Sequence, residues 1–182
     1  MKDASIALYA GTFGPITNGH LAVIEPCLDL FDELVIGIGQ NPNKNCPFTE
    51  QERIDMINES IHSLGICGAW RIEVFPYMFL VDYANQINAS FYVRGLRDED
   101  DYQFERRYAN MNSKFMPDIQ PIWIPAPKEF SEVSSSAVLQ ICGIDKWESR
   151  VRDLVPEPVF KVLLKKYNGK WDFSKKRRGT GN

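Results

Sequence analysis

The chain has 182 residues, of which 44% are hydrophobic and 25% charged, and its formal net charge is −3. This length and composition are typical of one globular domain with a substantial core. No apolar run approaches the roughly 18 residues that a membrane-spanning helix needs, and the first residues lack the long apolar stretch of a signal peptide. We therefore expect a cytoplasmic protein with no membrane partner.

The charge is unevenly distributed along the chain. Residues 1–164 carry 14 basic and 23 acidic side chains, whereas residues 165–182 carry seven basic side chains and one acidic one. An acidic body does not attract nucleic acid by general electrostatics, so we do not expect nucleic-acid binding. We divide the chain into a domain over residues 1–167 and a basic C-terminal tail over residues 168–182, which we expect to be flexible.

The four cysteines stand singly, and no two of them form a C-x-x-C pair. Their spacing indicates neither a zinc site nor a disulfide framework. We expect reduced thiols at Cys27, Cys46, Cys67 and Cys142.

Five short apolar runs alternate with helix-like segments. Such runs are typical of a parallel sheet that helices cover on both faces. The sequence therefore predicts an α/β fold with a doubly wound, five-stranded parallel sheet, whose ligands bind at the carboxyl ends of the strands. The predicted strands are Ile6–Ala10, Glu33–Ile38, Arg71–Phe75, Ser90–Val93 and Gln120–Ile124.

The clearest helix signal is a capping box, in which Thr49 is followed three residues later by Glu52. The helical spacing of Ile54, Ile57, Ile61 and Leu64 predicts its buried face. Further helices are expected over Leu21–Phe31, Phe79–Asn88, Asp98–Phe115 and Pro156–Tyr167, the last with Leu163 and Leu164 packing inward. Pro26 lies inside the first of these and removes a backbone donor, so we expect a kink or an early end there.

The segment from Gly11 to His20 is the most informative part of the chain. It joins the first predicted strand to the first predicted helix, contains three glycines and ends in one of only two histidines. Glycine-rich turns between a strand and a helix present backbone N–H groups to phosphates. This turn is therefore a candidate phosphate site.

Three other loops follow predicted strands and carry polar side chains. The loop at 41–47 contains Lys44, the loop at 94–97 contains Arg94 and Arg97, and the loop at 130–136 ends in three serines. All four loops lie at one edge of a parallel sheet. Together they suit a polyphosphate, and they offer neither a nucleophile with its base nor a carboxylate cluster for two metals. The chemistry they support is in-line phosphoryl or nucleotidyl transfer.

Each of these features also has a purely structural explanation. His20 would serve as a helix cap or a surface residue, Lys44 would be solvated, and the serines would be ordinary N-caps. The two arginines would pair with acids nearby in the sequence. Four such features after four of the five predicted strands are a much rarer coincidence than any one of them alone.

The motifs taken together resemble one family. Thr12-Phe13, Pro15 and Thr17-Asn18-Gly19-His20 resemble the T/HxGH signature of nucleotidyltransferases. The later motifs resemble, in order and spacing, those of bacterial phosphopantetheine adenylyltransferases. They are Pro42-Asn43-Lys44, Pro47-Phe48-Thr49 with Glu52-Arg53, Arg94-Gly95-Leu96-Arg97, Asn110-Met111-Asn112 with Met116-Pro117, and Ser134-Ser135-Ser136.

This resemblance implies a Rossmann-like nucleotidyltransferase fold and a reaction. The family transfers AMP from ATP to 4′-phosphopantetheine, releases pyrophosphate and forms dephospho-coenzyme A, without a covalent intermediate. It also implies Mg²⁺ accompanying ATP and a homohexamer. Feedback by coenzyme A is a further expectation, since a product-like molecule must fit the same site.

The resemblance also implies roles for individual residues. The catalytic ones would be His20, on the α-phosphate in the transition state, Lys44, on the acceptor and reacting phosphates, and Arg94, on the acceptor side. The ATP-binding residues would be Thr12, Phe13, His20, Gly95, Leu96, Arg97, Glu105, Phe130, Ser131, Glu132, Val133, Ser134, Ser135 and Ser136. The acceptor-binding residues would be Thr12, Lys44, Leu80 and Arg94, and none is assigned to a metal.

The chain departs from the family pattern most clearly at Gly14, where the family usually has Asp. The missing carboxylate is expected to affect the geometry of the turn or the handling of a metal. Two other functions therefore stay open. One is a sister nucleotidyltransferase that acts on a mononucleotide or uses CTP, and the other is a weakly catalytic nucleotide-binding homologue.

Overall fold

The computed structural model describes residues 4–43 and 45–167. The predicted tail at 168–182 and the predicted catalytic residue Lys44 lie outside the described residues. No helix in the described part of the chain is both long and apolar enough to cross a membrane.

Five parallel strands form one sheet in the order β3-β2-β1-β4-β5. The chain therefore builds outward from β1 in both directions, which is the doubly wound arrangement that the apolar runs predict. Its switch point lies between β1 and β4, where ligands of such sheets bind. The strands are β1 Ile6–Gly11, β2 Glu33–Gly39, β3 Trp70–Phe75, β4 Phe91–Leu96 and β5 Gln120–Pro125.

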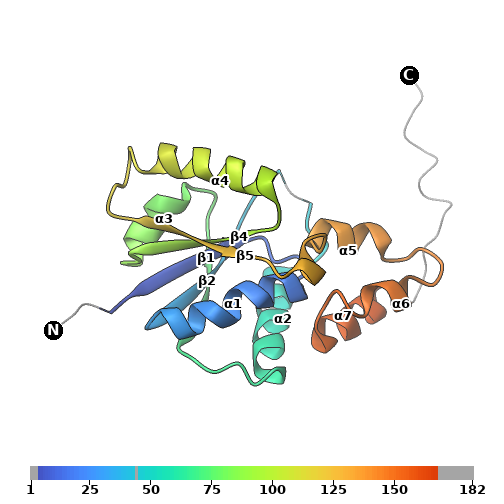
Figure 1. Cartoon of the computed structure of the whole chain (residues 1–182). Coiled ribbons are helices and arrows are strands. Elements are labelled where there is room, and N and C mark those ends of the chain that lie inside the picture. The colour runs from blue at the N-terminus through green and yellow to red at the C-terminus, as the bar shows by residue number, and fades with distance from the viewer. Residues whose placement is uncertain (1–3, 44, 168–182) are drawn as a thin grey trace.

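Helices cover both faces of the sheet, as Figure 1 shows. One face carries α3 and α4, the other carries α1 and α2, and α5 to α7 pack beside α1 and α2. The helices are α1 Asn18–Leu30, α2 Glu50–Ser63, α3 Leu80–Gln86, α4 Glu99–Asn112, α5 Ser135–Ile141, α6 Trp147–Val151 and α7 Glu157–Tyr167, with a short 3₁₀ helix, η1, at Lys128–Phe130.

Alternation along β1 divides the core in two. Ala7 and Tyr9 belong to the larger cluster, formed with α1, α2 and α5 to α7, whereas Leu8 and Ala10 belong to the smaller cluster under α3. This follows from the two-residue period of a strand, which sends successive side chains to opposite faces. The alternation also places the Tyr9 ring on the same side of the sheet as α1.

Two details of the predicted helices are wrong. The early end of α1 at Pro26 is wrong, since the helix continues to Leu30 and Leu21, Ile24 and Cys27 bury one face of it across the proline; the alternative of a kink there stays a prediction. Leu64 does not belong to the buried face of α2, because the helix ends at Ser63 and the Leu64 side chain is 56% exposed. Its buried face consists of Arg53, Met56, Ile57, Ser60 and Ile61, while Ile54 is half-buried.

Candidate active site

A cavity of about 590 Å³ lies at the carboxyl edge of the sheet, between the ends of β1 and β4 and the start of α5. It brings together most of the site residues that the sequence predicts. Those that line it are Thr12, Phe13, His20, Arg94, Gly95, Arg97, Phe130, Val133, Ser134, Ser135 and Ser136. Leu80, Leu96, Glu105, Ser131 and Glu132 do not line it, and their predicted substrate contacts stay predictions.

His20 both caps α1 and faces this cavity. The Thr17 backbone N–H donates to Nδ1 of His20 at 3.0 Å, and the Thr17 hydroxyl lies 2.8 Å from the same nitrogen. Thr17 is fully buried and is the N-cap of the helix. Because Nδ1 accepts a hydrogen bond from the backbone, the proton of the neutral ring belongs on Nε2. The ring therefore has a donor available for a ligand.

The surroundings keep the His20 imidazole neutral. Burial, and then the nearby positive charge of Arg97, lowers the pKa of His20 from 6.5 to about 4. The ring packs edge-on against Phe13, with centroids 5.2 Å apart, and Phe13 packs in the same way on Tyr9 at 5.4 Å. At neutral pH His20 is thus a rigidly held, uncharged hydrogen-bond donor.

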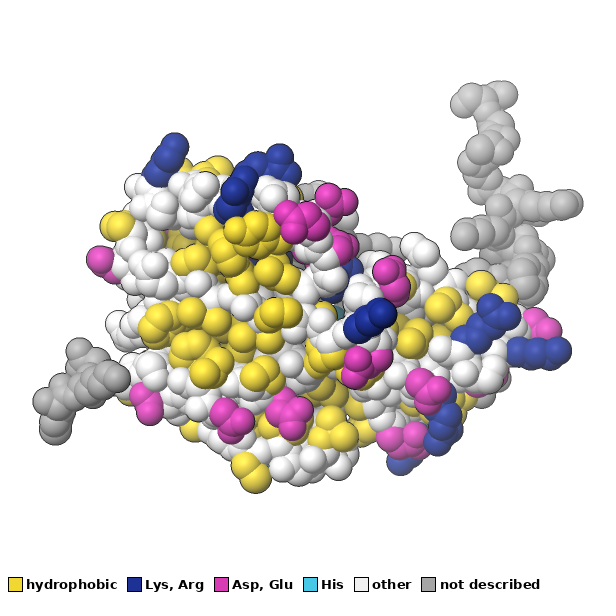
Figure 2. All heavy atoms as spheres, in the orientation of Figure 1, with side chains coloured by type: hydrophobic (Ala, Val, Ile, Leu, Met, Phe, Trp, Pro, Cys, Tyr) yellow, Lys and Arg dark blue, Asp and Glu magenta, His cyan; other side chains and the backbone are white. Residues whose placement is uncertain are grey.

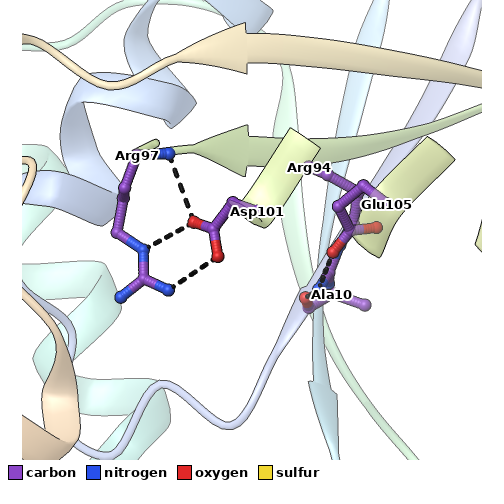
Figure 3. Close-up of polar contacts among 5 residues, drawn as sticks. All are labelled: Ala10, Arg94, Arg97, Asp101 and Glu105. Atoms are coloured by element: carbon purple, nitrogen blue, oxygen red, sulfur yellow. Dashed lines mark hydrogen bonds and ion pairs between the residues drawn. The ribbon is translucent and has the colours of Figure 1, made fainter. Parts of the chain in front are cut away.

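Helix α4 binds both Arg94 and Arg97 (Figure 3). The predicted loop at 94–97 is wrong in its extent, since β4 continues to Leu96 and Arg94 lies within the strand. Glu105 accepts from Arg94 Nε at 2.8 Å and lies 2.7 Å from its Nη2, while Arg94 Nη1 donates to the carbonyl of Ala10 at 3.3 Å. Asp101, one turn earlier, accepts from Arg97 Nε at 2.8 Å and Nη2 at 3.0 Å. Two carboxylates one turn apart therefore set two guanidinium groups at the cavity.

Arg53 belongs to one of the motifs of the family resemblance, but the sequence assigns it no role in the site. It is only 6% exposed, and its Nη1 donates to the Thr12 carbonyl at 2.9 Å. This bond connects α2 to the turn at Gly11–His20, here called the phosphate turn. A signal is present in the sequence, since Arg53 precedes Ile57 and Ile61 at four-residue spacing and so falls on the buried face. On the opposite side of the turn, the Ser135 hydroxyl donates to the Pro15 carbonyl at 2.7 Å.

Cys46 occupies the space that a side chain at position 14 would need. A Cβ built on Gly14 would overlap the Cys46 Sγ. Cys46 and Asn45 line the first cavity and also a second one, of about 860 Å³, formed largely by the loop after β2 and the start of α2. Thr12 also borders both. Two adjoining spaces thus meet at the phosphate turn.

Comparison with known proteins agrees with this geometry. Residues 8–141 match the cytidylyltransferase-like family. The solved nicotinic acid mononucleotide adenylyltransferase of Plasmodium falciparum, in complex with NaAD, has a TM-score of 0.66 at 17% identity, covering 91% of this chain and 96% of that one. A bifunctional NMN adenylyltransferase/ADP ribose pyrophosphatase from Francisella tularensis has a TM-score of 0.65 at 19% identity over 92% of this chain and 51% of its own. At such identities these structures show a shared fold.

Closer relatives are found among curated sequences. The phosphopantetheine adenylyltransferase of Chromobacterium violaceum is 40% identical over 162 residues, which cover 89% of this chain and 97% of the relative. That of Neisseria meningitidis serogroup C is 38% identical over 158 residues, covering 87% and 91%. That of Bartonella bacilliformis is 38% identical over 164 residues, covering 90% and 98%. The chain therefore belongs to the phosphopantetheine adenylyltransferase family, within the cytidylyltransferase-like nucleotidyltransferases.

Proposed function

We propose that this chain transfers AMP from ATP to 4′-phosphopantetheine, giving dephospho-coenzyme A and pyrophosphate. The observation that carries the proposal is the pair of adjoining cavities, which share the phosphate turn at Thr12. One cavity is lined by His20, Arg94, Arg97 and the hydroxyls of α5, as a polyphosphate requires. The other leaves room for a second substrate beside it.

The reaction is an in-line displacement at phosphorus. A phosphate oxygen of the acceptor forms a bond to the α-phosphorus of ATP, and the bond to the oxygen that leaves with pyrophosphate breaks. Charge accumulates on the oxygens of the transferring group, where preorganised donors act most strongly. Nε2–H of His20 is such a donor, and Arg94 lines the same cavity. The acceptor role of Arg94 and the contribution of Lys44 are predictions from the family resemblance.

Magnesium belongs to the proposal as a companion of ATP. Mg²⁺ in nucleotide sites is held mainly by phosphate oxygens and water, with one or two carboxylates at most. No Asp or Glu lines the first cavity, and the described residues contain no cluster of metal-ligating side chains. The donor set therefore fits an ion that arrives bound to the nucleotide. When bound, the ion supplies positive charge to the phosphates.

A homohexamer in the cytoplasm is the proposed working form, with coenzyme A as a feedback ligand of the same site. An apolar stripe on α4 supports self-association. Phe104, Tyr108 and Met111 follow one another at helical spacing and are all exposed. Hydrophobic side chains also gather in the middle of the face in Figure 2, over β5 and below α4.

Pyrophosphate release tests the proposed reaction directly. The full chain is incubated with ATP and Mg²⁺ and either 4′-phosphopantetheine or nicotinic acid mononucleotide. We expect pyrophosphate release in the reaction that contains 4′-phosphopantetheine and none in the reaction that contains the mononucleotide. Release only with the mononucleotide would assign the sister activity, and binding of ATP without release would assign a nucleotide-binding role.

His20→Ala tests the chemistry of the site. The variant loses the Nε2 donor, so we expect kcat to fall by about 10²–10³, the typical effect of removing one transition-state donor. His62→Ala is the matched control, since His62 is exposed on α2 and lines neither cavity. Equal turnover in the two variants would remove His20 from the mechanism.

A further inference from the structure

Tyr9 is a buried side chain whose polar end has no partner. The residue is 6% exposed and lies on β1, on the α1 side of the sheet. Its ring packs against Phe13 and lies 6.4 Å from the His20 ring, centroid to centroid. Among the described residues, the hydroxyl has no hydrogen-bond partner, although the charges of Arg94 and Arg97 act on it.

The Tyr9 hydroxyl opens on the first cavity. Tyr9 lines that cavity, and its oxygen is not among the sealed, unsatisfied polar atoms, whereas the Tyr92 hydroxyl is. Burial raises the pKa of Tyr9 well above its ordinary value of 10, so the phenol stays protonated and is able to donate. Buried hydroxyls are almost always hydrogen-bonded in folded proteins. An unpaired one at a cavity wall is therefore available to a ligand.

The position of the hydroxyl identifies the part of the ligand that it meets. A Cβ built on Gly95 would lie 3.9 Å from the Tyr9 oxygen and 2.9 Å from a methyl group of Val23. Gly95 and Val23 also line the cavity, and Leu139 adds a further apolar side chain. The hydroxyl thus lies beside Gly95 and Val23, where a base and its sugar fit, and the positive charges of Arg94 and Arg97 act on it from the same cavity.

We propose that the Tyr9 hydroxyl forms a hydrogen bond with the nucleoside part of ATP and so helps to orient the nucleotide beside His20. This role rests on the proposed function, because it takes ATP as the ligand of the first cavity. It makes Tyr9 a nucleotide-binding residue that the strand pattern alone presents as core.

Tyr9→Phe tests the role, with Tyr92→Phe as the matched control. Tyr92 is also buried, pairs with β1 in the sheet register opposite Leu8, and does not line the cavity. Each variant loses a single hydroxyl and keeps its ring, and thermal melting of the ligand-free chains checks that both fold. Calorimetry then measures the Kd of Mg·ATP and of pyrophosphate for wild type and both variants.

We expect Tyr9→Phe to raise the Kd of ATP about tenfold, the loss of one buried hydrogen bond, and to leave the Kd of pyrophosphate unchanged. Tyr92→Phe should change neither. Equal ATP affinity in wild type and Tyr9→Phe, or an equal loss for pyrophosphate, would overturn the role of Tyr9. A wild-type chain that binds pyrophosphate but not ATP would instead overturn the proposed function, and this inference with it.

Discussion

The imidazole of His20 shows how one side chain fills a structural and a chemical role at once. Thr17 and His20 form a reciprocal cap at the start of α1, in which the ring nitrogen takes the place that a Glu oxygen usually has. That bond uses Nδ1 and leaves Nε2 for the ligand. The sequence suggests a cap or a catalytic group as alternatives, and the geometry makes them compatible because the two ring nitrogens point to different partners.

The low pKa of His20 gives a prediction about pH. The folded chain holds the ring neutral down to about pH 4, whereas the unfolded chain protonates it near 6.5. Between these values the unfolded state binds more protons, so stability is full above pH 6.5 and falls as the pH drops toward 4. We expect wild type to lose about 1–3 kcal/mol more than His20→Gln over this window, measured by urea unfolding.

Imidazole signals in NMR check the same point without denaturant. With two histidines in the chain, His62→Gln leaves one set of ring signals to follow. A midpoint for His20 near 4 is expected from its burial and from the charge of Arg97. A midpoint at 6.5 would mean that the ring is hydrated and free of both influences.

Gly14 and Cys46 give a second prediction at the scale of residues. Because Cys46 Sγ fills the space beside Gly14, any side chain at position 14 must displace it. We expect Gly14→Ala to destabilise the chain by about 1–3 kcal/mol, as overpacked cores do. In a Cys46→Ala background, where the sulfur is gone, the same change should cost less than about 1 kcal/mol.

The double-mutant cycle needs only the free energies of unfolding of wild type, the two single variants and the double variant. Additive effects would show that the thiol and the turn are independent. The sequence marks Gly14 as a departure from the family but does not predict its neighbour, because Cys46 lies on a separate loop 32 positions later. Only the packing of the loop after β2 against the turn brings them together.

At the scale of elements, α4 acts as a template for the loop that precedes it. Asp101 and Glu105 are four residues apart and so project from one side of the helix. Glu105 binds Arg94 near the end of β4, and Asp101 binds Arg97 directly after it. Their acidic character is visible in the sequence, yet helix-dipole arguments account only for acids in the first turn, and Glu105 lies beyond it. The role of Glu105 therefore depends on how α4 is placed along β4, which the sequence pattern does not specify.

Glu105→Gln tests this template. Glu105 is 6% exposed, so its charge is a strong constraint on Arg94, and we expect the variant to raise the KM of the acceptor about tenfold and to lose about 1–2 kcal/mol of stability. Asp101→Asn affects the other, more exposed pair of the template and should cost less than about 1 kcal/mol of stability. Steady-state kinetics and urea unfolding give both quantities, and an unchanged KM of the acceptor in Glu105→Gln would contradict the template.

The elements themselves are largely predictable, and the errors have physical causes. Continuous apolar runs mark the five strands, because strands buried on both faces have few polar positions. Local signals mark the start of α2 at the Thr49 cap. The predictions at Pro26 and Leu64 fail because local sequence rules do not include tertiary packing. Helix α1 continues past Pro26 because one of its faces is buried, and Leu64 is exposed because α2 ends just before it. Helices α5 and α6 are too short for a clear periodic signal.

At the scale of the whole molecule, α4 buries polar side chains and exposes aromatic ones, the reverse of an ordinary amphipathic helix. Its buried residues are Glu105, Ala109 and Asn112, whereas Phe104 and Tyr108 are exposed and stack on each other, with centroids 5.9 Å apart. Polar groups face the protein because they hold the site, and the apolar stripe faces outward. Exposed apolar stripes of this kind mark interaction surfaces. The catalytic template and the proposed assembly surface are therefore two sides of one helix.

Phe104→Glu tests whether the exposed side of α4 is the assembly surface. We expect wild type to sediment as six copies of the chain and Phe104→Glu as a smaller species, because a charge in an apolar interface is costly to desolvate. Leu64→Glu is the control, since Leu64 is exposed to the same degree, 56% against 55%, but lies at the end of α2. A smaller species with unchanged melting would locate the interface on α4, whereas an unchanged hexamer would exclude the stripe.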